Sequence, residues 1–155
     1  MAGGATQAYA GPGGLGVKGP SDWHRDYSAA ISHVADYASP GTTSPLAGDY
    51  FRIGIGNTTP TGSFTDEANQ AAQFLRDTYH ADIISGPFYQ RYMWTTAAQI
   101  EFQYVSNKYG VRRHGVERLW RRGDRTMIIE SSGLSGDWQQ TLTVFTELLS
   151  SAREQ

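Results

Sequence analysis

The residues that most often carry catalysis or hold metals are scattered in this sequence. His24, His33, His80 and His114 show no spacing that would place two ligands on one helical face. The chain has no cysteine, which excludes disulfides, thiolate metal sites and cysteine nucleophiles. No G-x-S-x-G or S-x-x-K motif marks an activated serine. We therefore expect no catalytic residue, no metal site and no cofactor.

Paired carboxylates are the route to catalysis that spacing does not exclude. Any two of the 15 acidic residues could converge in the fold, and Asp82 and Glu101 stand out only by their apolar neighbours. The Gly54-Ile55-Gly56 segment follows a strand pattern but lacks the third glycine of a dinucleotide site and the lysine of a P-loop. We interpret it as the end of a strand.

Positive charge is concentrated between residues 108 and 125, which hold seven of the 13 Lys and Arg residues of a chain with net charge −2. Side chains alternate across a strand. One face of a strand here would carry Arg112, His114, Arg118, Trp120 and Arg122. Two interpretations stay open. The first is that these residues bind an anionic ligand through their guanidinium groups. The second is that the charges protect an edge strand from pairing with other chains. The net acidic chain argues against a nucleic-acid partner.

The elements that would position these residues follow from hydrophobic periodicity. Alternation of apolar residues predicts strands at 15–17, 29–37, 50–55, 83–84, 98–105, 111–121 and 126–131. Helical spacing predicts helices at 63–79 and 137–153, the second with Trp138, Leu142, Phe145, Leu149 and Ala152 on one stripe. Strands and helices in this order, with three consecutive strands joined by tight turns, indicate an α+β fold.

Residues 1–13 contain mostly Gly, Ala, Pro and small polar residues, and we expect them to form a flexible leader. Residues 14–155 then make one domain, since the length suits a single core. The first residues resemble the start of a segment excised from a longer protein. No apolar stretch approaches the ~20 residues that a membrane-spanning helix needs, so we expect membrane contact only through a tether absent from this chain.

Several segments resemble PsbP-like domains, which occur in actinobacterial lipoproteins and in the extracytoplasmic C-terminal parts of actinobacterial serine/threonine protein kinases. GLGVKGPSDW at residues 14–23 resembles the opening strand, proline turn and tryptophan of that family, and AQIEFQY at 98–104 resembles its acid-aromatic-tyrosine strand, with Ile100 where tryptophan is common. The remaining similarities are His114, Arg118 and Trp120 in the middle of the chain, and Ser131, Trp138, Phe145 and Ser151 near its end.

The resemblance implies an α/β/α sandwich in which a largely antiparallel sheet is flanked by helices, and a binding role with no catalytic residue. We accordingly expect a non-catalytic sensor or docking domain, extracytoplasmic or at the cell surface, that binds a small molecule, a cell-wall fragment or a protein. Two alternatives remain. One is a pocket enzyme of the nuclear-transport-factor-two-like type with an acid–His pair, and the other is an oligomeric interaction protein. A deep apolar pocket with convergent polar groups would favour the enzyme.

Overall fold

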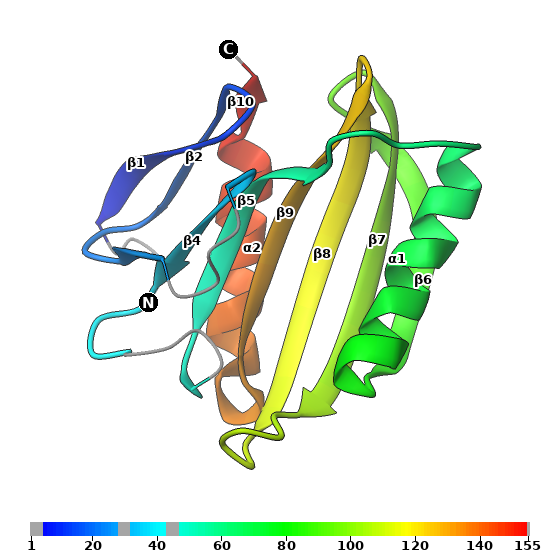
Figure 1. Cartoon of the computed structure of the whole chain (residues 1–155). Coiled ribbons are helices and arrows are strands. Elements are labelled where there is room, and N and C mark those ends of the chain that lie inside the picture. The colour runs from blue at the N-terminus through cyan, green and yellow to red at the C-terminus, as the bar shows by residue number, and fades with distance from the viewer. Residues whose placement is uncertain (1–4, 28–31, 43–46, 155) are drawn as a thin grey trace.

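Figure 1 shows the computed structural model of the chain, which describes residues 5–27, 32–42 and 47–154. The strands are β1 (Thr6–Gly11), β2 (Leu15–Pro20), β3 (His24–Asp26), β4 (Val34–Ala38), β5 (Tyr50–Asn57), β6 (Asp82–Tyr92), β7 (Thr95–Val105), β8 (Arg112–Arg122), β9 (Arg125–Leu134) and β10 (Arg153–Glu154). The helices are α1 (Phe64–Tyr79) and α2 (Trp138–Ser151), the latter preceded by a 3-10 turn at Ser135–Asp137.

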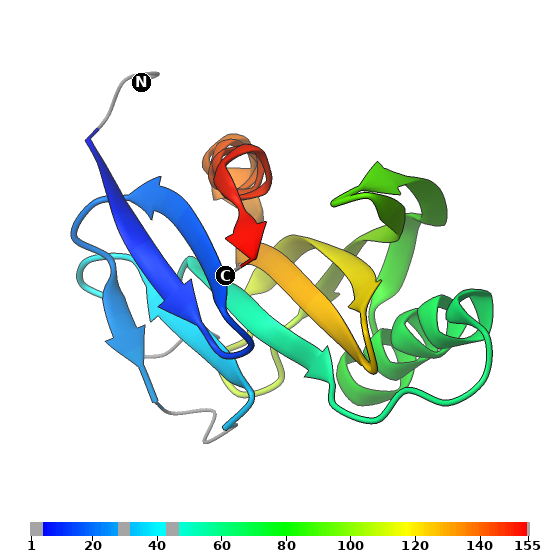
Figure 2. The ribbon, with the colours of Figure 1, turned by 90° about the horizontal axis from the view of Figure 1, so that it is seen from above.

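Seven strands form the main sheet in the order β3-β4-β5-β9-β8-β7-β6, and every neighbouring pair is antiparallel. The helices lie on opposite faces of this sheet (Figure 2). The α2 face is also covered by a small sheet of order β1-β2-β10. On the other face α1 lies over the β6 and β7 side of the sheet, so β5 and β9 are left beside the helix and not beneath it.

The larger core lies on the α2 face. Phe51 and Ile129 of the main sheet meet Phe145 and Leu148 of α2 there, together with Leu15 of the small sheet. Alternate residues of these strands point to this face, because side chains of a strand alternate between its two sides. The residues between them point to the α1 face, and those are the residues that build the site described below.

Helix α1 begins where the sequence predicts it. The Ser63 hydroxyl accepts a hydrogen bond from the Asp66 amide at 3.0 Å, and His80 ends the helix in a left-handed conformation. Ala68, Ala72 and Leu75 form its buried face. The small alanines let the helix approach the sheet closely, which fixes the distance between α1 and the residues beneath it.

The predicted strands at 50–55, 98–105, 111–121 and 126–131 are confirmed as β5, β7, β8 and β9. The predicted strand at 83–84 is the start of the much longer β6. The predicted strand at 29–37 overlaps β4 only from Val34, and its first residues fall partly outside the described residues.

The second helix is confirmed, but its predicted stripe is displaced. The buried residues of α2 are Thr141, Val144, Phe145 and Leu148. Leu142 is exposed and Trp138 is half-buried, because the contact face of α2 is rotated by about one residue from the stripe that apolarity alone selects.

The expected flexible leader at residues 1–13 is wrong for the part that the structure describes. Residues 6–11 form β1, which pairs with β2 over its whole length. Tyr9 is 6% exposed and lies edge-on to the rings of Tyr37 and Phe51. A single aromatic residue thus docks a segment that is otherwise small and polar, and the described domain begins before residue 14.

The interpretation of the basic strand as a protected edge is also wrong. β8 lies between β7 and β9 in the interior of the sheet. Its charged side chains therefore project from the two faces of the sheet and not from an edge, so edge protection does not explain them. Within the described residues, no helix has the length and apolarity needed to span a membrane.

A polar pocket between the first helix and the sheet

The structure does not gather the predicted basic residues into an open anion-binding face. Arg112 is exposed at the start of β8. The His114 ring lies 2.7 Å from a Glu101 carboxylate oxygen and stacks on Trp138, with ring centroids 3.4 Å apart. Arg118 donates a 3.1 Å hydrogen bond from Nε to Gln99. These contacts tie His114 and Arg118 to the α2 side of the sheet.

The last two predicted residues also have structural partners. Trp120 is 1% exposed and donates from Nε1 to Glu154 at 2.8 Å. Arg122 lies 3.1 Å from the same carboxylate and donates to the Gly13 carbonyl at 2.8 Å. The five residues share a face as predicted, but α2 and β10 cover most of it. The opposite face of the sheet, which carries α1, is less completely covered.

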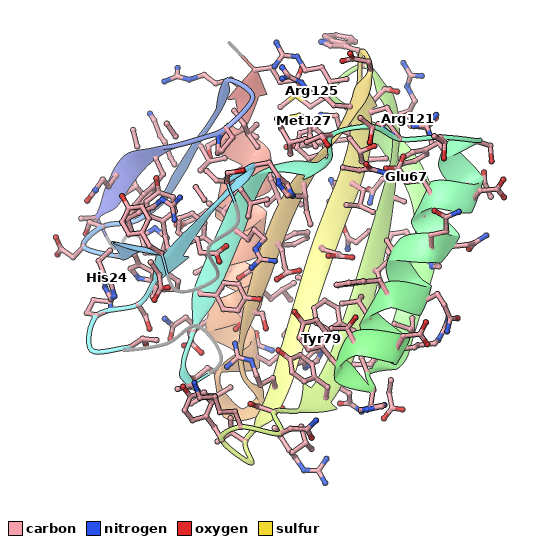
Figure 3. The ribbon with its side chains drawn as sticks, in the orientation of Figure 1. His24, Glu67, Tyr79, Arg121, Arg125 and Met127 are labelled. Atoms are coloured by element: carbon pink, nitrogen blue, oxygen red, sulfur yellow. The ribbon has the colours of Figure 1, made fainter. Side chains whose placement is uncertain are left out.

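That face holds a pocket of about 330 Å³ between α1 and the strands β4, β5, β8 and β9. Its apolar wall consists of Val34, Ala71, Leu75, Leu119 and Ile128. Arg52, Glu117 and Glu130 form a polar floor, and Glu67 and Tyr79 of α1 lie toward opposite ends of the helix above the sheet (Figure 3). The pocket is partly open to solvent, and a concave, mostly apolar space with a few convergent polar groups is the usual form of a small-molecule site.

The floor is one row of charged side chains that crosses four strands. Strand register places Asp36 opposite Arg52, Arg52 opposite Glu130, and Glu130 opposite Glu117. All four are buried or half-buried. Directly opposed residues of neighbouring strands have their side chains in contact range. Three carboxyl groups and one guanidinium group therefore lie in one row beneath the pocket.

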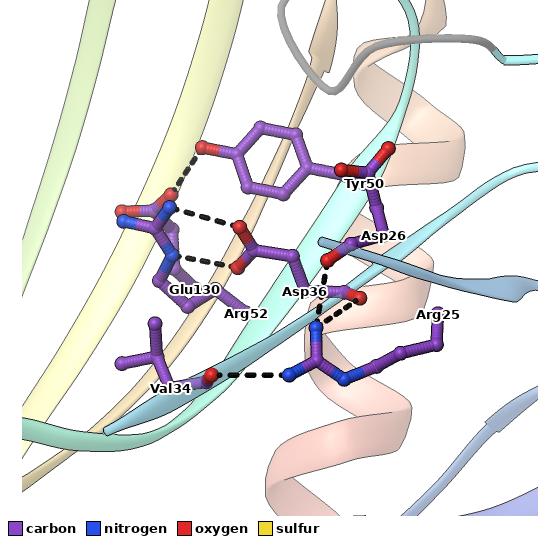
Figure 4. Close-up of polar contacts among 7 residues, drawn as sticks. All are labelled: Arg25, Asp26, Val34, Asp36, Tyr50, Arg52 and Glu130. Atoms are coloured by element: carbon purple, nitrogen blue, oxygen red, sulfur yellow. Dashed lines mark hydrogen bonds and ion pairs between the residues drawn. The ribbon is translucent and has the colours of Figure 1, made fainter. Parts of the chain in front are cut away.

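Hydrogen bonds hold most of this row in place (Figure 4). Arg52 donates to both oxygens of Asp36, at 2.7 and 3.0 Å, and the Tyr50 hydroxyl donates to Glu130 at 2.6 Å. Burial lowers the pKa of Arg52, but the bond to Asp36 and the surrounding negative charge outweigh it, so its pKa lies above the usual value. Arg52 is charged, and Asp36 neutralises it.

Glu117 differs from the rest of the row because its carboxyl group meets another carboxyl group. It is 5% exposed, and Glu130 is its hydrogen-bonding neighbour. Burial first, and then the charge of Glu130, raises the pKa of Glu117 well above its ordinary value. One proton shared by two carboxyl groups is the expected state of such a pair. The pocket therefore has a protonated carboxyl group in its floor.

One end of the pocket is closed by a second set of polar contacts. Glu67 of α1 accepts hydrogen bonds from Arg121 at 3.0 Å and from Asn57 at 3.2 Å, and a third from Thr126. Arg121 also donates to the Gly62 carbonyl at 3.0 Å. These bonds fix the first turn of α1 against β5, β8 and β9, so this part of the pocket is formed in advance of any ligand.

The pKa of Glu117 gives a testable pH dependence. A carboxyl group whose pKa is raised on folding stabilises the folded state below its unfolded pKa, and this contribution is lost as pH rises through the folded pKa. Glutamine imitates the protonated form at every pH. We expect Glu117→Gln to unfold at a higher temperature than the wild type at about pH 8, and the difference to shrink toward about pH 5.

Thermal unfolding followed by circular dichroism at several pH values measures this difference. Asp49, whose pKa burial and Asp137 raise to about 6, titrates in the same direction in both proteins and cancels in the comparison. The exposed Asp124 provides the matched control Asp124→Asn. A Glu117→Gln protein that is less stable than the wild type at pH 8 would mean that Glu117 is ionised and favourably paired.

Sequence reasoning singled out Asp82 and Glu101 among the acids and missed the residues of this floor. Glu101 lies on the α2 face with His114, away from the pocket. A usable signal was present in the strand patterns, because Arg52 and Glu130 each interrupt an otherwise apolar strand. A charge at such a position requires a buried partner, and both residues have one.

The sequence matches no family model and no curated protein. Solved structures match over nearly the whole chain. The cyanobacterial PsbP protein (CyanoP) of Synechocystis sp. PCC 6803 has a TM-score of 0.70 at 16% identity, covering 100% of this chain and 96% of that one. LpqN of Mycobacterium tuberculosis, described as involved in cell envelope biogenesis, has a TM-score of 0.67 at 11% identity, covering 95% and 90%.

The Ran-binding protein Mog1p of Saccharomyces cerevisiae matches with a TM-score of 0.60 at 10% identity, covering 97% of this chain and 96% of that one. Identities this low establish the shared fold and leave the ligand open, because one fold serves many functions. The chain has the PsbP-like fold, an α+β arrangement of a largely antiparallel sheet with helices on both faces.

Proposed function

We propose that this chain is a non-catalytic binding domain whose pocket between α1 and the sheet receives a small ligand with an apolar body and a hydrogen-bond-donating head. The observation that carries the proposal is the buried Glu117 carboxyl group at the floor of an apolar pocket. A buried carboxyl group is costly without a good partner, and Glu130 repels the ionised form of Glu117. A donor group on a ligand would bond the carboxyl pair in place of the proton that Glu117 shares with Glu130.

The charges of the floor favour a cationic head. Asp36 and Arg52 neutralise each other, while Glu117 and Glu130 sharing one proton retain one negative charge. An ammonium group can replace the shared proton and bond both carboxylates. The walls formed by Leu119, Ile128 and their neighbours would cover the apolar part of the same molecule.

The arrangement of the acids supports binding over catalysis. Among the described residues, Glu101 and His114 form an acid–His pair on the α2 face. The His114 ring is stacked on Trp138, so this pair does not meet the pocket. Glu130 is engaged by Tyr50. The second candidate function, general acid–base catalysis, is favoured by the hydrogen-bonded carboxyl pair, because two carboxyl groups that share one proton can supply both an acid and a base.

The cellular setting is part of the proposal. We propose an extracytoplasmic sensor or docking domain of a lipoprotein or a membrane-tethered kinase, which fits both the sequence resemblance and the shared fold of LpqN. A small molecule or cell-wall fragment would occupy the pocket. A protein would dock elsewhere on the surface, a role supported by the shared fold of the Ran-binding Mog1p.

Titration calorimetry with three six-carbon probes tests the binding proposal. Hexylammonium, hexanol and hexanoate share an apolar body and differ in the charge of the head group. We expect the affinity to fall from hexylammonium to hexanol to hexanoate, because the carboxyl pair attracts the cation and repels the anion. Glu117→Gln should remove the preference for hexylammonium and keep the binding of hexanol.

Two further variants distinguish the effect of the apolar space from the effect of charge. Ala71→Phe, which fills the apolar wall, should weaken all three probes, and the exposed control Asp124→Asn should change none. Equal, weak binding of every probe to all variants would contradict the proposal. A hydrolytic activity that is lost in both Glu117→Gln and Glu130→Gln, and kept in Asp124→Asn, would show that the carboxyl pair is catalytic and would contradict a purely binding role.

A further inference from the structure

Among the strands that the structure describes, β6 is the longest that lies at the edge of a sheet. It has 11 residues and ends the main sheet on one side, whereas β3, which ends it on the other side, has three. In Figure 1 β6 lies next to α1, on the side of the main sheet away from the small sheet. Alternate backbone N–H and C=O groups of an edge strand point away from its sheet and can pair with another chain.

Only the first half of β6 has the features that protect an edge strand. Its pairing with β7 shifts register twice before Phe88, and Pro87 has no backbone N–H to donate. From Phe88 to Tyr92 the two strands pair residue by residue without a shift. Bulges and prolines discourage pairing between sheet edges, so residues 88–92 are the part of β6 that remains suited to it.

The side chains around this segment are aromatic and exposed. Phe88 is 40% exposed, Tyr89 is 42% exposed, and Trp94 in the turn that follows is 94% exposed. Arg91 is the one charged residue among residues 88–92. Soluble proteins usually protect a long edge strand with charges, whereas aromatic side chains are enriched where two proteins meet. The composition of this edge is therefore typical of an interface.

The side chains of the segment are divided between the two faces of the sheet. Tyr92 points to the α2 face, where its hydroxyl donates to the Leu149 carbonyl at 2.7 Å. Tyr89 points to the α1 face, where its ring lies edge-on to Phe64 with centroids 6.3 Å apart. Because side chains alternate along a strand, the even-numbered residues from 88 to 92 share the α2 face and the odd-numbered residues share the α1 face.

We propose that residues 88–92 form the interface of a homodimer, in which they pair with the same residues of a second copy as antiparallel strands. The two-fold axis passes beside Gln90, so the Gln90 side chains of the two copies lie opposite each other. Such an interface is isologous, because both copies use the same surface. The main sheets of the two copies become one continuous sheet.

A second copy is the favoured partner because the segment, Phe-Tyr-Gln-Arg-Tyr, is complementary to itself in this register. On the α2 face, Phe88 of each copy lies opposite Tyr92 of the other, which gives two aromatic pairs. On the α1 face, Arg91 of each copy lies opposite Tyr89 of the other. A guanidinium group over a tyrosine ring is a favourable cation–π contact.

The dimer is independent of the ligand pocket over Glu117. The residues that line that pocket come from α1 and from strands other than β6, so association and ligand binding can fail separately. The paired segment is short, which predicts a weak dimer with a dissociation constant of about 10–100 μM.

Sedimentation equilibrium between about 5 and about 500 μM protein covers this range. Gln90→Lys and Gln90→Glu each place like charges directly opposite each other, so each variant alone should associate at least about fivefold more weakly than the wild type. An equimolar mixture of the two should associate about as strongly as the wild type, because opposite charges then face each other. Gln140→Lys and Gln140→Glu, at an exposed position of α2, are the matched controls and should behave like the wild type.

Two further variants test the contacts without placing a charge in the interface. Phe88→Ala should weaken association about tenfold, because each dimer loses two aromatic pairs, and Leu142→Ala at an exposed leucine of α2 should have no effect. The chain has no cysteine, so Gln90→Cys provides a single thiol. Mild oxidation should join two copies of Gln90→Cys faster than two copies of Gln140→Cys, because the Gln90 positions lie opposite each other.

Three outcomes would overturn the proposal. A wild-type protein that stays monomeric up to the highest concentration would mean that this edge does not pair with its own copy. Association that Phe88→Ala leaves unchanged, or that mixing the two Gln90 variants fails to restore, would place the dimer interface elsewhere. Binding to lipid vesicles that is lost in Trp94→Ala, by a protein that stays monomeric, would assign the exposed aromatic residues to a membrane surface.

Discussion

Replacing Trp120 with alanine should lower the free energy of unfolding by about 3–5 kcal/mol. The indole is 1% exposed, lies edge-on to Tyr92 with ring centroids 5.1 Å apart, and bonds Glu154. Truncation would leave a cavity under α2 and remove one of the two partners of the Glu154 carboxylate, which would keep its ion pair with Arg122. Guanidinium unfolding followed by fluorescence and circular dichroism measures the loss.

Trp94 is the matched control because it is 94% exposed at the turn between β6 and β7. Trp94→Ala should change the free energy of unfolding by no more than about 0.5 kcal/mol. A Trp120→Ala protein with wild-type stability would mean that Trp120 lies at the surface. It would then favour the anion-binding face that alternation along the predicted strand suggested for Arg112, Arg118 and Arg122.

Replacing Tyr9 with alanine should also lower the free energy of unfolding by roughly 3–5 kcal/mol. Tyr9 is the aromatic residue that docks β1, and its ring contacts Tyr37 and Phe51. Its hydroxyl donates to the Pro20 carbonyl and accepts from the Trp23 amide at 3.3 Å. The same denaturant titration serves here.

Tyr27→Ala, at an exposed tyrosine, is the control for this change and should have little effect. Deleting residues 1–12 should destabilise the domain at least as much as Tyr9→Ala, because it removes the whole of β1. If the deletion protein were as stable as the wild type, the result would support the flexible leader that the composition of residues 1–13 predicts.

The parts of the fold that the sequence predicts are those with strong periodicity. β7 alternates cleanly from Ala98 to Val105, and α1 has both a capping serine and an apolar stripe. The sequence does not predict β1, because Tyr9 is its only large apolar residue and one residue gives no periodicity. Its order comes from tertiary contact with Phe51, which is distant in the sequence.

The candidate sites could not be predicted for a related reason. Alternation along β8 correctly separates Arg113 and Glu117 from Arg118 and Trp120, but it does not show which side is covered. That depends on the order of the strands, which places β8 in the interior and Glu130 beside Glu117. The spacing of residues along the sequence therefore cannot predict which charged side chains pair across neighbouring strands.

The most direct test of the binding pocket is to locate a bound probe by NMR. Intermolecular nuclear Overhauser effects between hexylammonium and the side-chain methyl groups report which wall the alkyl chain touches. We predict contacts to Leu119, Ile128 and Leu75, with none to Leu142 or Leu149 on the α2 face. Contacts confined to Leu142 and Leu149, or no contacts at a saturating concentration, would contradict the assignment of the pocket between α1 and the sheet.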